Sequence, residues 1–146
     1  MMLRWLKGEQ CCTDTDYLQV VTRLGGTTIG ASQVRALAHF GVEAKFVTDM
    51  TRELCNALLR NGEVVGLGYL HKGPVTAPYG FGHWCLAWDL LPGEKRIRVH
   101  DPAGDPDLVR GGFISREGCD LTFSWRNFGP RFLPYGESSG YALFLK

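Results

Sequence analysis

The fold is decided by residues 83–101, which read HWCLAWDLLPGEKRIRVHD. Strand-like runs flank a four-residue centre, Leu91-Pro92-Gly93-Glu94. Proline followed by glycine at the centre of four residues is the signal of a type II turn. The sequence therefore predicts two strands, His83–Leu90 and 96–101, that form an antiparallel hairpin.

This hairpin brings a histidine close to an aspartate. With the turn centred on Pro92-Gly93, the antiparallel register sets His83 opposite Asp101 or Pro102. Opposed side chains lie about 5 Å apart at Cβ, within reach of a hydrogen bond from imidazole to carboxylate. Asp101 also ends the apolar face of its strand, where a carboxylate needs a partner. We therefore predict a His83–Asp101 pair, which either belongs to a reactive site or only holds the hairpin together.

Helical patterns occupy the chain before residue 63. Apolar residues recur every three or four positions over 14–24, glycines follow at 25 and 26, and Thr13, Asp14 and Thr15 are candidate amino-terminal caps. Further helices are predicted over 32–40 and 49–60, and strands over 63–71, 121–125 and 141–145. Helices followed by antiparallel strands indicate an α+β fold, with residues 1–146 forming a single domain.

The five cysteines lack the paired spacing of a zinc ribbon, which favours reduced thiols. Cys11 and Cys12 come just before, or in, the first turn of the helix predicted over 14–24, where the helix dipole stabilises a thiolate. Cys12 is therefore a candidate nucleophile for the His83–Asp101 pair. Two alternatives stay open: Cys12 as a packed structural thiol, and Cys11 as the nucleophile. The remaining cysteines are predicted core thiols: Cys55, Cys85 and Cys119.

Three segments together resemble a known family. Residues 12–26 read CTDTDYLQVVTRLGG, residues 82–84 read GHW, and residues 101–104 read DPAG. These segments are similar to the nucleophile helix, the GH or GHW strand start and the DPxG strand end of papain-like cysteine peptidases of the bacteriocin-leader-processing (double-glycine peptidase) type. The carboxyl-terminal segments FSWRNF (123–128), RF (131–132) and GYA (140–142) resemble the phage-encoded branch. The likeness runs from about Gln10 to the end of the chain.

The resemblance implies a papain-like fold, in which amino-terminal helices pack on an antiparallel β-sheet. It implies Cys12 as nucleophile, His83 as general base and acid, and Asp101 as the residue that orients His83. It also implies an oxyanion-hole glutamine several residues before the cysteine. No amide stands at that distance, and the nearest is Gln10, which is therefore the candidate for this role.

The activity implied is cysteine-dependent hydrolysis of a peptide or amide bond, with a cell-wall (peptidoglycan) peptide as substrate if a phage encodes the chain. The alternative is a catalytically degenerate peptidase-like module that binds other virion proteins, for instance in a tail or baseplate. The displaced glutamine motivates this alternative. The loop 73–82 leads into His83, so Pro78, Tyr79 and Phe81 either line a substrate groove or form a plain rigid connection.

Composition argues against several other classes of function. Lysine and arginine total 16 against 15 acidic residues, a net charge of +1, which argues against nucleic-acid binding. Apolar runs are too short to span a membrane, and the amino terminus lacks the features of a signal peptide, so we expect a location in the host cytoplasm or the virion. Asp101, Asp105 and Asp107 lack the spacing of a calcium loop, and we expect no metal or cofactor.

Overall fold

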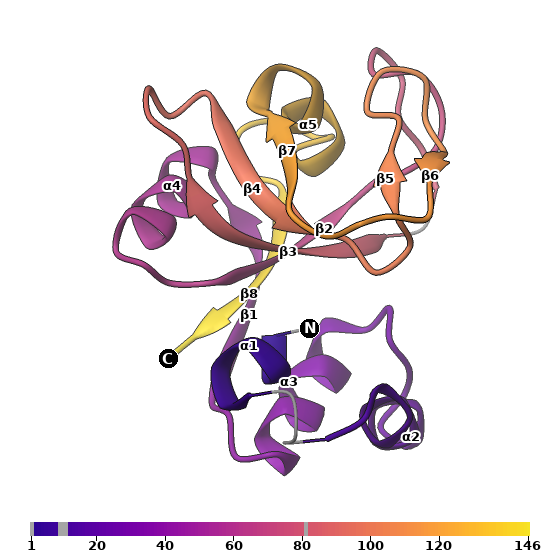
Figure 1. Ribbon diagram of the computed structural model, residues 1–146, viewed down its shortest axis with the longest axis vertical. Helices are drawn as coiled ribbons and strands as arrows, with labels where there is room; N and C mark the ends of the chain where they lie inside the picture. Colours follow the sequence, from indigo (N-terminus) through magenta and orange to yellow (C-terminus); the bar gives the residue numbers. More distant parts are fainter. Residues whose placement is uncertain (1, 9–11, 81) are drawn as a thin grey trace.

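The computed structural model describes residues 2–8, 12–80 and 82–146 and has an α+β architecture. Its main sheet has six strands in the order β1-β8-β2-β3-β4-β7, with all neighbours antiparallel, and β5 pairs with β6 in a separate sheet (Figure 1). The strands are β1 (Ala44–Met50), β2 (Val65–Tyr69), β3 (His83–Leu90), β4 (Arg96–His100), β5 (Asp105–Pro106), β6 (Phe113–Ser115), β7 (Leu121–Ser124) and β8 (Gly140–Leu145). The helices are α1 (Met2–Lys7), α2 (Asp14–Arg23), α3 (Gly30–His39), α4 (Arg52–Arg60) and α5 (Trp125–Phe132).

The two faces of the main sheet have different helical partners. One face packs with α4 and α5 around the main core, which includes Cys55, Leu67, Phe123 and Phe128. The amino-terminal helices α1, α2 and α3 form a separate group at the end of the molecule near β1 and β8 (Figure 1). This group has its own smaller apolar cluster: Leu3, Leu37, Val42 and Ala44. The chain thus places its first three helices apart from the main core.

The predicted hairpin is present as β3 and β4. The amide of Glu94 donates to the carbonyl of Leu91 at 3.0 Å, and Gly93 has φ +81°, as the third position of a type II turn requires. The predicted register is wrong, because Leu90 pairs with Ile97 rather than with residue 94 or 95. The connection between the strands is 91–95, one residue longer than the four of Leu91-Pro92-Gly93-Glu94, since β4 begins only at Arg96, and a bulge between Ala87 and Asp89 shifts the register again.

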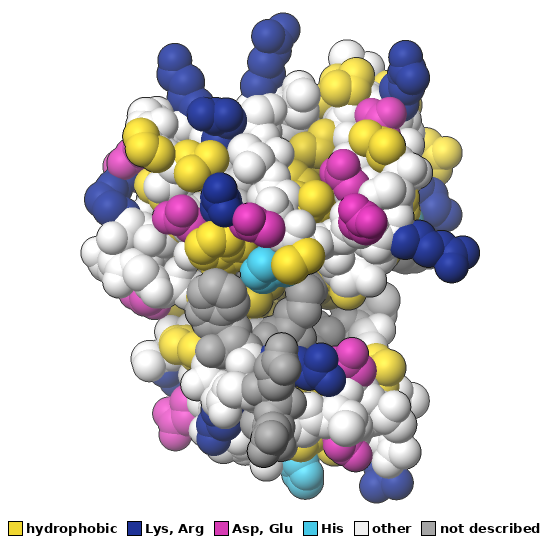
Figure 2. All heavy atoms as spheres, viewed as in Figure 1, with side chains coloured by type: hydrophobic (Ala, Val, Ile, Leu, Met, Phe, Trp, Pro, Cys, Tyr) yellow, Lys and Arg dark blue, Asp and Glu magenta, His cyan; other side chains and the backbone are white. Residues whose placement is uncertain are grey.

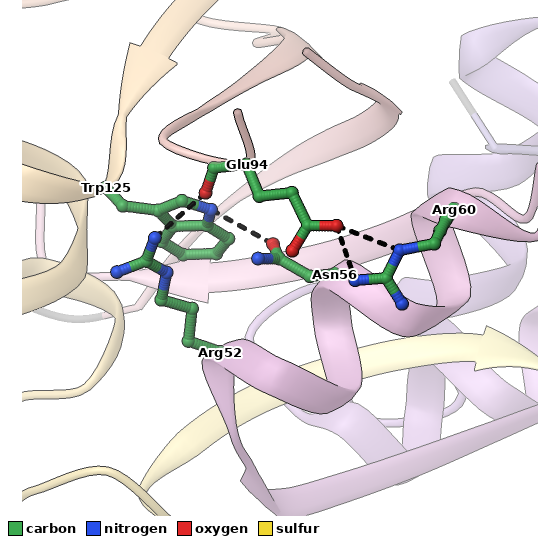
Figure 3. Close-up of polar contacts among 5 residues, drawn as sticks. All are labelled: Arg52, Asn56, Arg60, Glu94 and Trp125. Atoms are coloured by element: carbon green, nitrogen blue, oxygen red, sulfur yellow. Dashed lines mark hydrogen bonds and ion pairs between the residues drawn. The ribbon is translucent and has the colours of Figure 1, made fainter. Parts of the chain in front are cut away.

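Helix α4 holds the turn of this hairpin (Figure 3). Arg52 donates to the backbone carbonyl of Glu94 at 2.8 Å, and Arg60 donates twice to its carboxylate, at 2.9 and 2.6 Å. The Glu94 backbone has φ +53°, a left-handed conformation that costs energy outside glycine. These contacts to α4 hold Glu94 in the conformation that lengthens the connection.

The helix predicted over 14–24 is confirmed as α2, with Thr13 as its cap. The Thr13 hydroxyl accepts from the amide of Asp16 at 3.1 Å, and the Asp16 carboxylate accepts from the amide of Thr13 at 2.9 Å. This reciprocal pair is a capping box, which satisfies amides that the helix itself leaves without partners. The capping box of Thr13 and Asp16 therefore sets the start of α2 at Asp14.

Several boundaries and one burial prediction are wrong. The helix predicted over 32–40 is Gly30–His39, and the strand predicted over 63–71 is Val65–Tyr69. The helix predicted over 49–60 begins only at Arg52, where the Thr51 hydroxyl accepts from the amide of Leu54, and the residues before it form β1. The strand predicted over 121–125 ends at Ser124, which caps the unpredicted helix α5. Cys55 and Cys85 are buried as predicted, whereas Cys119 is exposed. Sequence periodicity missed β1 because three of its seven residues, Lys45, Thr48 and Asp49, are exposed and polar and do not alternate regularly with apolar ones.

Charge on the molecule is mixed rather than clustered on the face shown in Figure 2, where lysine and arginine side chains project between aspartate and glutamate. On that face the surface also narrows between the sheet-bearing part and the group of amino-terminal helices. Of the helices in the described part of the chain, none has both the length and the apolar character needed to cross a membrane.

Candidate active site

His83 and Asp101 form the predicted pair. Nε2 of His83 lies 2.7 Å from Oδ1 of Asp101, and the Asp101 side chain is fully buried while that of His83 is 19% exposed. A carboxylate can only accept at this contact, so the proton lies on Nε2 and the neutral imidazole keeps its lone pair on Nδ1. The pair therefore presents a basic nitrogen on the side of the ring away from Asp101.

Two further donors hold the Asp101 carboxylate. The hydroxyl of Tyr69 donates to Oδ2 at 2.6 Å, and the amide of Ala103 donates to Oδ1 at 2.9 Å. A buried carboxylate needs such partners, because an unpaired charge in the interior is very costly. Tyr69 is itself 2% exposed, and burial, more than the nearby Cys85 and Asp101, raises the pKa of its phenol far above the ordinary value. Tyr69 is thus a permanent donor to Asp101.

The backbone around Asp101 depends on two glycines. The amide of Asp101 donates to the carbonyl of Gly118 at 2.7 Å, and a Cβ on Gly118 would lie 1.9 Å from the Asp101 carbonyl oxygen. A Cβ on Gly104, the last residue of the DPAG segment, would lie 2.0 Å from the carbonyl oxygen of Ser115. Any side chain at either position would push the two segments apart. The glycine of DPAG is therefore required by close backbone packing.

Aromatic rings surround the His83 imidazole. Tyr69 meets it edge to face with ring centroids 5.3 Å apart, and Phe113 of β6 does so at 5.5 Å. His71, two residues beyond the end of β2, lies 5.5 Å from His83 between centroids. Edge-to-face contacts of this kind favour one orientation of the ring. The imidazole is consequently fixed by packing as well as by its hydrogen bond.

Cys12 lies at a cavity of about 370 Å³ between the amino-terminal helices and the sheet. Trp84 and Pro102, the residues that directly follow His83 and Asp101, line the same cavity. The described lining residues include neither His83 nor Asp101. The structure therefore places Cys12 beside the strand ends that carry the pair but across the sheet from it, because the pair faces the main core and the cavity lies on the opposite face.

At the start of α2, some groups favour the thiolate form of Cys12 and others oppose it. The helix terminus favours a thiolate, but the capping box already uses the Asp16 amide, and Asp14 and Asp16 add two carboxylates to the first turn. Hydrogen bonds from Thr13 lower the pKa of Asp16, so this carboxylate stays charged. Burial, together with the nearby Cys12, raises the pKa of Tyr17 to about 12. Tyr17 therefore stays a neutral phenol beside Cys12.

The remaining predicted site residues are either outside the described part of the chain or away from the cavity. Gln10, Cys11 and Phe81 lie outside the described residues. Tyr79 is 61% exposed, and the backbone of its loop pairs with Lys72 rather than extending along the cavity. Within the described ranges, no group of three or more His, Cys, Asp and Glu side chains is arranged to hold a metal ion.

Sequence reasoning missed Tyr69, His71 and Phe113. Tyr69 could have been found, because it alternates with Val65 and Leu67 on the buried face of β2, and a polar tip at the end of an apolar face needs a partner. Nothing in the order of residues indicated that Phe113 would reach His83, since its strand belongs to the separate two-stranded sheet.

Comparisons with known proteins do not assign a family. No protein-family model matches the chain, and no curated protein is significantly similar to it.

Proposed function

We propose that this chain is a cysteine-dependent hydrolase of peptide or amide bonds, with Cys12 as nucleophile, His83 as general base and acid, and Asp101 as its orienter. The observation that carries the proposal is the buried pair, in which Asp101 Oδ1 lies 2.7 Å from His83 Nε2 and leaves Nδ1 as the basic nitrogen. The α+β architecture, with helices against an antiparallel sheet, is compatible with a papain-like fold.

The reaction requires Cys12 and His83, which the structure places on opposite faces of the sheet, to come into contact, and would then proceed in two balanced steps. Nδ1 of His83 removes the proton of the Cys12 thiol, Sγ attacks the carbonyl carbon, and the C–N bond breaks as the amine takes that proton from His83. Water then gives a proton to His83 while its oxygen attacks the thioester, and the C–S bond breaks as Sγ takes that proton back from His83, which releases the carboxylic acid and restores the thiol. Asp101 keeps the imidazole in the required tautomer throughout.

The oxyanion formed in each step needs a donor. Gln10 is the nearest amide before Cys12 in the sequence, and we assign this role to it. Loss of one such donor typically costs about 10²- to 10³-fold in kcat. Gln10→Ala is therefore expected to reduce turnover by about that factor without removing it, which kinetics on a peptide substrate measures.

A cell-wall peptide is the proposed substrate class. It follows from the resemblance to phage-encoded peptidases, and a virion-associated location is part of the same proposal. The test is release of new amino groups from purified peptidoglycan, compared with release from an unrelated unfolded protein. Cys12→Ala and His83→Ala are expected to abolish release, whereas Cys119→Ser, which changes an exposed thiol, should retain it. Wild-type turnover in both Cys12→Ala and His83→Ala would overturn the proposal.

A catalytically inactive binding module is the second candidate. The observation that favours it is the first turn of α2, where the Asp16 carboxylate and a completed capping box oppose a thiolate at Cys12, while Asp14 is paired with Arg4 at 3.6 Å. The discriminating measurement is the pH dependence of iodoacetamide alkylation at Cys12, with Cys119 as the internal reference. A nucleophile reacts well below pH 8, and a thiol that reacts only at the pH of Cys119 favours the binding module.

A further inference from the structure

Arg131 of α5 is a cation buried in the interior. It is 0% exposed, and its guanidinium donates to four backbone carbonyl oxygens, those of Leu70 at 2.9 Å, Lys72 at 3.2 Å, Gly73 at 2.7 Å and Leu108 at 2.8 Å. A guanidinium carries its donors in a rigid planar fork, so these bonds fix the carbonyls relative to each other as well as to α5. Arg131 therefore joins two chain segments, one at 70–73 and one at 108.

The first segment continues strand β2, which ends at Tyr69. Tyr69 donates to Oδ2 of Asp101, and the next residue, Leu70, is bonded to Arg131 twice. The Leu70 amide donates to the Arg131 backbone carbonyl at 3.1 Å, and the Leu70 carbonyl accepts from the Arg131 guanidinium. The donor that holds the Asp101 carboxylate is therefore adjacent to a residue that Arg131 fixes at both its amide and its carbonyl.

His71 lies in the same segment, with its backbone held on both sides. The carbonyls of the residues before and after it accept from Nη1 of Arg131, and its own carbonyl accepts from the amide of Gly112 at 2.8 Å. Its ring lies 5.5 Å from that of His83 between centroids. Because a side chain keeps its place only while its backbone does, the contact of His71 with His83 depends on the bonds that Arg131 makes.

The second segment carries another ring that packs on His83. Phe113 of β6 meets the imidazole edge to face at 5.5 Å between centroids. Its hairpin, formed by β5 and β6, lies beside the loop that follows β2 (Figure 1), and the carbonyl of Leu108 in this hairpin accepts from Nε of Arg131. Both segments that bring rings to His83 thus meet at Arg131.

We infer that Arg131 is a positioning residue for His83, and that it acts by holding Tyr69, His71 and Phe113 against the imidazole and its aspartate. Its guanidinium bonds to backbone carbonyls, so it acts through these side chains rather than on a substrate. The inference rests on the proposed function for the role of His83 in hydrolysis. The positioning of the imidazole does not depend on that role and can be measured without turnover.

The experiment measures how readily the His83 ring reacts with diethyl pyrocarbonate. Peptide mapping by mass spectrometry gives its rate relative to that of His39, which is exposed, whereas the His83 side chain is 19% exposed. Arg131→Met removes the fork, and Arg131→Lys keeps the charge but presents its donors from one atom. We expect both variants to raise the relative rate at His83 by at least about fivefold, because loss of buried hydrogen bonds shifts local opening by that order. Nitrogen chemical shifts of the His83 ring should change in the same variants.

A matched control separates positioning from a general loss of stability. Asn56→Ala breaks the buried bond to the Trp125 indole at the start of α5, so it should destabilise the fold but leave the rate at His83 unchanged. An equal rise in Asn56→Ala would overturn the inference. Wild-type rates and chemical shifts at His83 in both Arg131 variants would also overturn it.

A double-mutant cycle tests the route through Phe113. Phe113 is 38% exposed, so Phe113→Ala removes its ring from the edge of the core and should raise the rate at His83. If Arg131 acts in part through this ring, Arg131→Lys and Phe113→Ala together should raise the rate by less than the product of their separate effects. A rate equal to that product would contradict the inference.

The wild type keeps the test decisive if the Arg131 variants do not fold. In urea below the unfolding transition, the amides of Leu70 and Gly112 should lose their protection from hydrogen exchange in the same opening that exposes His83 to the reagent. A His83 that becomes reactive while both amides stay protected would overturn the inference.

The outcome for hydrolysis is separate. Arg131→Lys should lower kcat by about tenfold with little change in KM, since small misplacements in a site can cost up to about 10²-fold. A His83 ring that is displaced in this variant, in a protein whose wild type hydrolyses nothing, would reject the proposed function and leave Arg131 as the residue that positions the imidazole.

Discussion

The hydroxyl of Tyr69 donates a 2.6 Å hydrogen bond to Oδ2 of Asp101 in the buried interior beside His83. Removing this donor in Tyr69→Phe leaves one oxygen of a buried carboxylate with one partner fewer, which typically costs about 1–3 kcal/mol. We expect a loss of that size in the free energy of unfolding measured with urea. Tyr141→Phe is the matched control, because Tyr141 is half-exposed and should change stability little.

A readout beyond stability distinguishes positioning from packing in Tyr69→Phe. Loss of the donor lets Asp101 move, so the His83 ring should change its nitrogen chemical shifts and the proposed hydrolysis should slow by about tenfold or more, since small misplacements in a site can cost up to about 10²-fold. Unchanged shifts at His83 in a destabilised variant would assign Tyr69 to packing alone.

The buried thiol of Cys55 makes stability depend on alkaline pH. Burial raises the pKa of Cys55 to about 12, and burial raises that of Cys85 well above its ordinary value. The unfolded chain loses these protons first, so their contribution to stability is complete below about pH 9 and is lost as pH rises towards 12. Cys55 is expected to lower the free energy of unfolding by about 1.4 kcal/mol per pH unit in that window, and Cys85 acts in the same direction.

Chemical denaturation at pH 8, 9 and 10 measures this loss. Cys55→Ala should show a shallower decline than the wild type, because alanine does not titrate. A thiol reagent at pH 8 should modify the exposed Cys119 and leave Cys55 and Cys85 unreacted until the protein unfolds. Parallel declines for the wild type and Cys55→Ala would contradict the raised pKa.

Arg131 is expected to be the most sensitive charged residue of the fold. It is 0% exposed, and its guanidinium donates to four carbonyl oxygens, those of Leu70, Lys72, Gly73 and Leu108. Arg131→Met leaves these buried acceptors unpaired, at a cost of at least about 2 kcal/mol. Arg131→Lys should recover only part of this, because an ammonium cannot match the planar fork.

Urea unfolding compares these variants with Arg126→Met on the same helix. Arg126 is exposed, so this control should stay within about 0.5 kcal/mol of the wild type. Limited proteolysis adds a local readout, since the segment 70–73 should be cut faster in Arg131→Met. Equal stability of Arg131→Met and Arg126→Met would show that the carbonyls find other donors.

Two contacts between α4 and its surroundings should differ in strength although they are neighbours in Figure 3. Arg60 and Glu94 form an ion pair with side chains 55% and 45% exposed, and such pairs contribute about 0–1 kcal/mol. Asn56 is buried and accepts from the Trp125 indole at 3.0 Å, so Asn56→Ala leaves a buried donor unpaired at about 1–3 kcal/mol. We expect Asn56→Ala to lower the urea midpoint more than Arg60→Ala does. A larger loss of the urea midpoint in Arg60→Ala than in Asn56→Ala would show that burial does not decide the strength of these two contacts.

The sequence correctly predicted the features that depend only on residues a few positions apart. The turn at Pro92-Gly93 and the cap at Thr13 each depend on backbone and side-chain chemistry of their immediate neighbours, and both are confirmed. The register of the hairpin was wrong because β4 begins only at Arg96, after the left-handed Glu94, which accepts from Arg52 and Arg60 of α4, an element distant in sequence. The residues of the hairpin alone could not have predicted a contact with α4.

Of the candidate site, the sequence predicted the part that lies within one hairpin. His83 and Asp101 were paired from the hairpin alone, and the bond survives the error in register because the Asp101 side chain follows the last paired residue of β4 and reaches across the strand ends. The cavity at Cys12 was not predictable, since three helices and three strands build it.

The sequence by itself determined the α+β character, the hairpin, the α2 cap and the identity of the His83–Asp101 pair, because each follows from periodicity or from chemistry between near neighbours. Only the tertiary structure decided that Tyr69 holds Asp101, that Phe113 packs on His83 and that Cys12 lies at an apolar cavity. These contacts depend on how separate elements pack. Packing is a property of the whole set of apolar faces, and no single segment of the sequence contains it.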